Sequence, residues 1–248
     1  MPASPDKSGE RRHYWRQLAR GISFDAAVIM LAATVLIIIF HENGSSLFFR
    51  RHFAPLVRNW PLHDLYPAIY WFGCSLLMLG LLPYLLGRWV LGFRPAELGV
   101  GLGDWRFGLK AVAVLYLLFL PVLVATSYLP QFQTKYPLFA AATLGGGRLL
   151  VYELAYAVYF LGWEFVFRGF LLFGLKPTLG LQAVFVQTIP FAILHFGKAE
   201  VETLAAVGAG VILGFLALRA RSFWYGWLLH SLIAVSNDLL AMWHKHLL

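Results

Sequence analysis

The residues of this sequence that could carry out chemistry are a few ionisable side chains within long apolar segments of the C-terminal half. They lie on three stretches of chain: Glu153, Glu164 and Arg168 on the first, His195 on the second, and His230, Asn237 and Asp238 on the third. Residues four apart share one face of a helix, so Glu164 and Arg168 are expected to meet. A carboxylate beside imidazoles can activate water, and nearby N–H donors can stabilise an oxyanion.

The apolar segments around these residues indicate a membrane protein. The chain has 248 residues, of which 60% are hydrophobic and 13% charged, whereas a soluble domain carries roughly 25% charged residues. A helix of about 20 apolar residues can cross a bilayer. We therefore expect an all-α polytopic transmembrane bundle of about seven spans, within a range of six to eight. The expected spans are approximately 21–40, 65–86, 111–129, 149–175, 181–196, 201–218 and 222–243.

The basic residues are distributed unequally between the two sides of the expected bundle. Residues 1–20 form a basic tail, and residues 21–248 form a single transmembrane domain. With the tail in the cytoplasm, 13 Lys and Arg residues fall on the cytoplasmic side and seven on the other, as the positive-inside rule requires. This topology and anionic lipid headgroups account for the net charge of +8 without a nucleic-acid partner.

The polar groups of the three stretches fall at similar depths in the expected bundle. At about 1.5 Å per residue, Glu164, His195 and His230 lie roughly 12–21 Å from the cytoplasmic ends of their helices. Ionisable groups inside a bilayer are costly, so they are expected to face the protein interior. Taken singly, the Glu164–Arg168 pair could be structural, and each histidine could be a hydrogen-bonded core residue. Their coincidence on three helices favours a catalytic pocket.

Three segments, in this order, resemble the motifs of the CPBP intramembrane proteases, the superfamily of CAAX-prenyl and bacteriocin-processing proteases. Residues 163–169, Trp-Glu-Phe-Val-Phe-Arg-Gly, resemble the first motif, Glu-Glu-x-x-x-Arg-Gly. Residues 191–195, Phe-Ala-Ile-Leu-His, match the second, Phe-x-x-x-His, and His230 matches the histidine of the third, His-x-x-x-Asn/Asp. The resemblance covers a protease-like core of about residues 95–243. It implies a divergent bacterial member, integral to the cytoplasmic (inner) membrane.

The sequence departs from this pattern at two positions. Trp163 stands where the family has its first glutamate, to which the family assigns the main role in activating water. Ala234 stands where the third motif has Asn or Asp, whereas Asn237 and Asp238 follow His230 by seven and eight residues. Both spacings are close to two full turns, so the third site could be rebuilt one turn further along the same face.

The resemblance and the buried residues together lead us to expect an intramembrane endopeptidase that hydrolyses a peptide bond of a membrane-anchored protein or peptide. Glu164 would take a proton from water with the help of His195. His230 and Asn237 would stabilise the oxyanion, and Arg168 would keep Glu164 ionised. Supporting roles are expected for four further residues: Glu153, Trp163, Phe191 and Asp238.

Metal dependence and two other functions stay open at this point. Glu164, His195 and His230 could ligate zinc, but the sequence lacks His-Glu-x-x-His, so we expect no tight metal site and no cofactor. One alternative is a non-catalytic membrane scaffold or bacteriocin-immunity protein that binds a membrane peptide in the same groove. The other is an ion- or proton-coupled transporter that uses Glu153, Glu164 and Asp238 as a relay.

Overall fold

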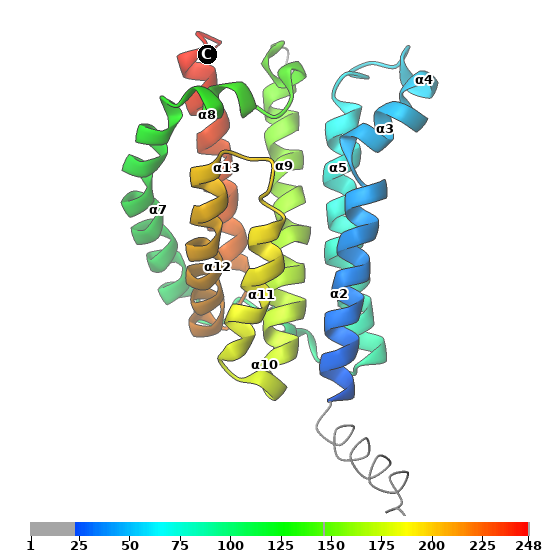
Figure 1. Cartoon of the computed structure of the whole chain (residues 1–248), viewed down its shortest axis with the longest axis vertical. Coiled ribbons are helices and arrows are strands. Elements are labelled where there is room, and N and C mark those ends of the chain that lie inside the picture. Colours follow the sequence, from blue (N-terminus) through cyan, green and yellow to red (C-terminus); the bar gives the residue numbers. More distant parts are fainter. Residues whose placement is uncertain (1–22, 146, 248) are drawn as a thin grey trace, which may run out of the picture.

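The computed structural model describes residues 23–145 and 147–247, and over these residues the chain is helical and contains no strand. Figure 1 shows the long helices side by side in a bundle. The expected all-α class is therefore confirmed. The basic tail, residues 1–20, lies outside the described residues.

Five helical segments are long and apolar enough to cross a membrane: α2 (Phe24–Asn43), Tyr66–Val90, α7 (Trp105–Ser127), Arg148–Leu179 and α12 (Glu200–Ala220). They correspond to the first, second, third, fourth and sixth expected spans. Two of them consist of several consecutive helical elements. Residues 66–90 comprise α5 (Tyr66–Ser75), η1 (Leu76–Leu81), α6 (Leu82–Leu85) and η2 (Leu86–Val90). Residues 148–179 comprise α9 (Arg148–Glu164), η5 (Phe165–Phe173) and α10 (Gly174–Leu179).

The fifth expected span is shorter than predicted, and the seventh has the predicted length but is less apolar than the five. The fifth is the 12-residue helix α11 (Gln182–Ile193). At about 1.5 Å per residue it extends only about 18 Å, less than the hydrocarbon core of a bilayer. The seventh, α13 (Trp224–His244), has 21 residues but is not among the five, since it carries several polar residues. One face of α11 stays exposed through Phe185, Ile189 and Ile193, while its other face packs against α12 and η5.

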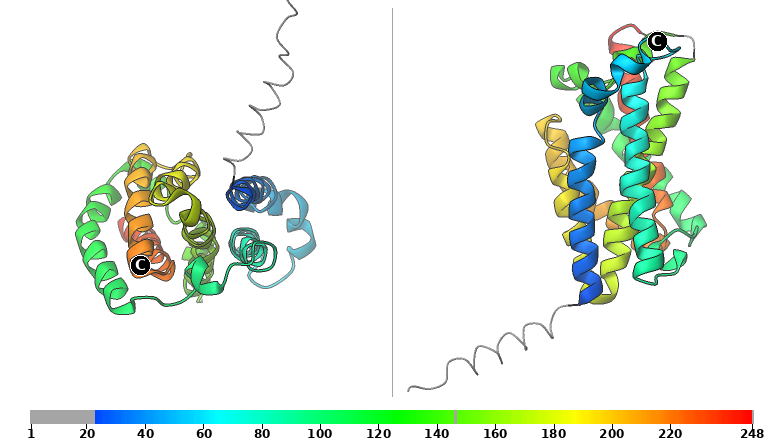
Figure 2. Two further views of the ribbon diagram at one scale, coloured as in Figure 1. Left: turned by 90° about the horizontal axis from the view of Figure 1, so that it is seen from below. Right: turned by 90° about the vertical axis from the view of Figure 1, so that its right-hand side faces the viewer.

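The composite helix 148–179 is the centre of the bundle, and most of its residues are buried. It contacts α5 and η1 on one side and α13 and α11 on the other, as Figure 2 also shows. Gly162 permits the contact with α5, because a Cβ there would come within 2.2 Å of the Ser75 carbonyl oxygen. The Ser75 hydroxyl donates to the Tyr159 carbonyl at 2.8 Å across the same contact.

The two ends of the bundle differ in structure. One end, which we call the α10 end, contains α10, η3 (Pro95–Leu98) and the first residues of α2, α7 and α13. At the other, the α8 end, lie the short helices α3 (Ser46–His52), α4 (Ala54–Val57), α8 (Pro130–Lys135) and η4 (Ala140–Thr143). The prediction that α2 begins on the cytoplasmic side would make the α10 end cytoplasmic.

Candidate functional site

The candidate site is built around the Glu164 carboxylate at the junction of α9 and η5. Its Oε1 accepts a hydrogen bond from Arg168 Nη1 at 2.9 Å and lies 2.7 Å from His230 Nδ1 on α13. The Glu164 and Arg168 side chains have no exposed surface. A Cβ at Gly226 of α13 would lie 2.8 Å from Oε2. A glycine at this position therefore lets α13 approach the carboxylate closely.

Arg168 is held by the carboxylate and by aromatic rings. Its guanidinium carbon lies 4.2 Å from the centre of the Phe191 ring, a distance typical of a cation–π contact. Its Nε and Nη2 have no hydrogen-bond partner among the residues that the structure describes. A buried ion pair with unsatisfied donors contributes little to stability. Arg168 is therefore better explained as the group that orients Glu164 and balances its charge.

The hydrogen bonds define the tautomers of the two histidines. His195 Nδ1 lies 2.7 Å from the Phe191 carbonyl oxygen, and His230 Nδ1 lies 2.7 Å from Glu164 Oε1. Carbonyl and carboxylate oxygens only accept hydrogen bonds, so in both rings Nδ1 carries the proton. The neutral rings therefore each present Nε2 as an acceptor. The two rings are nearly parallel, with centroids 6.4 Å apart.

Two cavities meet at His195 and His230. The first, the apolar chamber, has a volume of about 380 Å³ and lies among α7, α11, α12 and α13, with mostly aliphatic walls. The second, the polar chamber, has a volume of about 550 Å³ and extends from Trp163 and the two histidines toward the α8 end. Both histidines line both cavities. A chain that passes from one chamber to the other must therefore pass these two rings.

The comparison with protein families bears on this same segment. Residues 145–236 match the family model described as type II CAAX prenyl endopeptidase Rce1-like. This segment is therefore similar to the CPBP superfamily. The match covers less than half of the chain but contains all three resembling segments, and the family it describes is one of CAAX-type proteases. No curated protein and no solved structure matches the chain.

The first CPBP motif is arranged differently from the sequence-based expectation. Glu164 lines neither chamber and lies behind His230, although we expected it to contact water directly. Trp163, in place of the superfamily's first glutamate, lines the polar chamber. Its ring stacks on Tyr159, with centroids 5.4 Å apart, and meets the His195 ring edge-on at 6.0 Å. The Trp163 indole therefore forms the chamber wall at the position where the family resemblance predicts a glutamate carboxylate.

The other predicted residues fall in three different places. Phe191 is 1% exposed and packs against both histidine rings, with centroid distances of 4.8 and 5.9 Å. Asn237 lines the apolar chamber, about 10 Å further along α13 than His230. Glu153 and Asp238 line neither chamber, and their carboxylate oxygens are buried without a hydrogen-bond partner in the described ranges. The structure therefore brings Phe191 to the cluster and keeps Glu153 and Asp238 apart from it.

The zinc site that the sequence left open stays a prediction. Among residues 23–145 and 147–247, no group of three or more His, Cys, Asp or Glu side chains is arranged to hold a metal ion. The Nδ1 atoms of His230 and His195 are engaged with Glu164 and with a carbonyl oxygen, so only the two Nε2 atoms remain open. We therefore assign no catalytic step to a metal.

Several residues of the polar chamber were missed by the sequence analysis. Arg50, Lys135 and Lys198 line this chamber but entered the analysis only as charges that report on topology. They come from α3, α8 and the loop before α12, far apart in the sequence. No motif joins them, and only the tertiary packing of the α8 end brings them together.

Proposed function

We propose that the chain is an intramembrane endopeptidase in which His230 activates the attacking water and Glu164 acts through His230. The observation that carries this proposal is the 2.7 Å contact between His230 Nδ1 and Glu164 Oε1, together with the position of His230 in both chambers. The substrate would be a membrane-anchored protein or peptide, with its apolar part in the apolar chamber and its polar part in the polar chamber.

In the proposed reaction, His230 Nε2 takes a proton from water while the hydroxide attacks the scissile carbonyl carbon. The Glu164 carboxylate holds Nδ1–H and stabilises the imidazolium, as the carboxylate does in other carboxylate–histidine pairs. The tetrahedral intermediate collapses as the C–N bond breaks, and the imidazolium returns its proton to the leaving amine. Arg168 is a positioning residue, because it contacts Glu164 rather than the substrate.

His195 and Asn237 would complete the proposed site. His195 Nε2, an acceptor beside the same cavity junction, would accept a hydrogen bond from the other O–H of the water and so orient its oxygen for attack, without removing that proton. Asn237 would offer its amide to a substrate carbonyl or the oxyanion from the apolar chamber. Phe191 keeps the Arg168 guanidinium and the His195 ring in place through the contacts described above.

A second function is favoured by one observation, the indole of Trp163 in the chamber wall. An indole cannot exchange a proton with water, so a chain that lost the first glutamate could keep the groove and bind a membrane peptide without cleaving it. Such a non-catalytic scaffold or immunity protein would retain its cellular effect in a Glu164→Gln variant.

The deciding experiment compares the termini of membrane proteins in cells that produce the wild type, Glu164→Gln, His230→Ala, or His63→Ala. His63 is an exposed histidine of the α8 end and serves as the matched control. The protease proposal expects new termini with the wild type and His63→Ala only. Identical profiles in all four strains, with the wild-type phenotype retained by Glu164→Gln, would instead support the scaffold.

A further inference from the structure

The polar chamber has a strongly one-sided charge. Its wall contains three cationic side chains, Arg50, Lys135 and Lys198, and three histidines, His41, His195 and His230. Within the described part of the chain, neither Asp nor Glu lines it. A cavity with cations and no carboxylate attracts anions, and its low-dielectric walls strengthen that attraction.

Two of the three cations remain available to a ligand. Lys198 is neutralised by Glu202, whose Oε1 lies 2.6 Å from Lys198 Nζ. Lys135 donates to the Gly197 carbonyl at 3.1 Å, which leaves its charge uncompensated. Arg50 makes no ion pair with any described residue.

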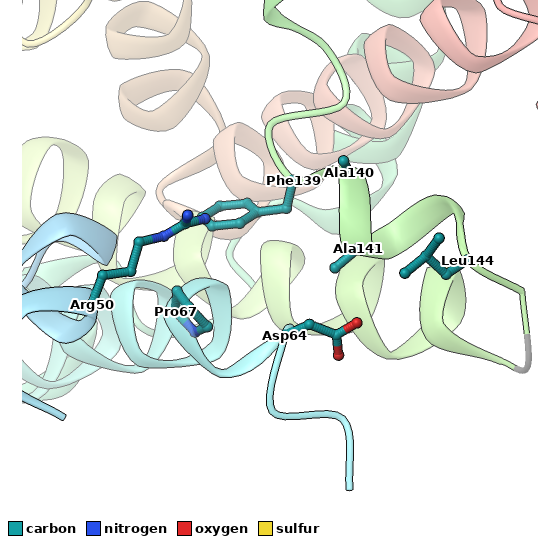
Figure 3. A pocket seen from close by; sticks show the side chains of 7 residues that line it. All are labelled: Arg50, Asp64, Pro67, Phe139, Ala140, Ala141 and Leu144. Carbon is teal, nitrogen blue, oxygen red and sulfur yellow. The ribbon is translucent and has the colours of Figure 1, made fainter. Parts of the chain in front are cut away.

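Asp64 and Arg50 line the same pocket, but the Asp64 carboxylate is already paired with Arg148. Its Oδ2 accepts from Arg148 Nη1 at 2.6 Å. Figure 3 shows Arg50 extending from α3 toward Phe139, while the Asp64 carboxylate lies on the side of Ala141 and Leu144. The guanidinium of Arg50 is therefore free to bind a carboxylate from outside the chain.

Arg50 also occupies a junction between cavities. Arg50 and Phe139 line both the polar chamber and the outer pocket of Figure 3, which has a volume of about 400 Å³. The polar chamber in turn shares His195 and His230 with the apolar chamber. The three cavities therefore adjoin in one order, from the apolar chamber past the histidines to Arg50. A peptide held at the histidines has Arg50 and Lys135 on its polar side.

We propose that Arg50, together with Lys135, forms a subsite that binds a carboxylate of the substrate on the polar side of the scissile bond. This inference rests on the proposed function. A guanidinium can bind a carboxylate through two parallel hydrogen bonds, whereas a lysine supplies a single point charge. The carboxylate comes either from an acidic side chain or from a chain terminus. The position of Arg50 at the junction of two cavities favours a peptide over a lipid headgroup.

The test measures binding rather than cleavage. The full-length Glu164→Gln protein is reconstituted in phosphatidylcholine nanodiscs, and binding is followed by tryptophan fluorescence, since Trp71 and Trp163 line the polar chamber. The probes are three N-palmitoyl alanine pentapeptides: one with a free C-terminal acid, one with a C-terminal amide, and one amide with a glutamate at the fourth position. Because the readout is binding, and Glu164→Gln slows any hydrolysis strongly, this measurement is independent of whether the protein is a protease.

We expect one or both acidic probes to bind about tenfold more tightly than the plain amide, as a charge-assisted hydrogen-bonded pair can provide. This preference should disappear in Arg50→Gln and weaken in Lys135→Gln. Arg51→Gln is the matched control, because Arg51 adjoins Arg50 but lines none of the three cavities. Tight binding of the free acid alone identifies a chain terminus as the source, and tight binding of the glutamate peptide identifies a side chain.

Three results would overturn the subsite. The first is equal affinity for all three probes, or no binding of any of them. The second is the same effect of Arg50→Gln and Arg51→Gln. The third is an effect of Arg50→Gln on probe affinity that appears only when phosphatidylglycerol is added, while the ratio of acid to amide affinity stays unchanged. That result would assign Arg50 to lipid headgroups. A retained acid preference in a protein that cleaves nothing would preserve the subsite and reject the protease.

Discussion

His230 Nδ1 lies 2.7 Å from Oε1 of Glu164, and this contact links the buried carboxylate to the two chambers. Glu164 has no exposed surface and lines no cavity, whereas His230 lines both chambers. The carboxylate can therefore influence a water molecule in the cavity only through the imidazole. The pair behaves as one catalytic unit in the proposed mechanism.

The first prediction concerns the coupling of these two residues. We expect Glu164→Gln to lower kcat by about 10²–10⁴-fold, as for removal of a group that supports a general base. KM should change little, because Glu164 lies outside the chambers. His230→Ala should lower kcat at least as much, and the double variant should be no worse than His230→Ala alone. The measurement is kcat and KM on a substrate identified from the cleaved termini.

The double variant provides the sharp control for that prediction. If Glu164 activated water directly, its loss would further reduce the activity that remains without His230, and the two effects would multiply. Multiplying effects would therefore assign the base to Glu164. The exposed His63→Ala variant should match the wild type in both constants.

The fold class could be predicted from the sequence because apolar length alone indicates a spanning helix. Five spans were recognised correctly on this basis. The prediction failed for residues 181–196. This stretch is apolar enough for a spanning helix, but the helix it forms, α11, has only 12 residues. Hydropathy does not show where within an apolar stretch the helix ends.

The site could be predicted only in part, for a related reason. Spacing on one helix was sufficient to pair Glu164 with Arg168. It could not show which of Glu164 and His230 faces the cavity, since that depends on how α13 approaches α9 through Gly226. The cations of the α8 end, such as Arg50, come from elements distant in the sequence, so no periodicity reports their convergence.

The second prediction concerns the stability of the buried ion pair. Arg168→Leu should destabilise the protein by about 3–5 kcal/mol, because it leaves the Glu164 carboxylate buried without a cation. Adding Glu164→Gln should recover part of this loss by removing the charge. The measurement is thermal unfolding in detergent. Equal unfolding temperatures for the single and the double variant would show that the cost comes from lost packing against Phe191 instead.

The third prediction concerns the approach of α13 to α9. In Gly226→Ala the new Cβ would lie 2.8 Å from Glu164 Oε2, so α13 must shift. We expect a loss of about 1–3 kcal/mol of stability from overpacking and a fall in kcat. Gly73→Ala on α5 is the matched control, because a Cβ there meets nothing within 4 Å. Both variants are compared by thermal unfolding and turnover, and equal behaviour would contradict the prediction.

The fourth prediction concerns pH and the α8 end. The side-chain hydrogen bond from Arg148 holds the pKa of the Asp64 carboxyl below its ordinary value of 3.8. A carboxyl with a lowered folded-state pKa stabilises the protein above its unfolded pKa, and this contribution is lost as the pH falls through the folded value. Asp64→Asn should therefore lower stability at pH 7, by about 1 kcal/mol for this partly exposed pair. The difference in unfolding temperature between Asp64→Asn and the wild type should become smaller below about pH 4. A difference that stays constant with pH would contradict this prediction.

The fifth prediction decides which compartment supplies the substrate's polar segment. The polar chamber extends toward the α8 end, and the positive-inside rule predicts that this end is extracytoplasmic. In a Cys74→Ser background, Arg58→Cys at the α8 end should react with a membrane-impermeant maleimide in intact cells. Gly101→Cys, in the loop after η3 at the α10 end, should react only after permeabilisation. Labelling of Gly101→Cys but not Arg58→Cys in intact cells would show that the Arg50 subsite faces the cytoplasm. The substrate carboxylate would then have to come from the cytoplasmic side.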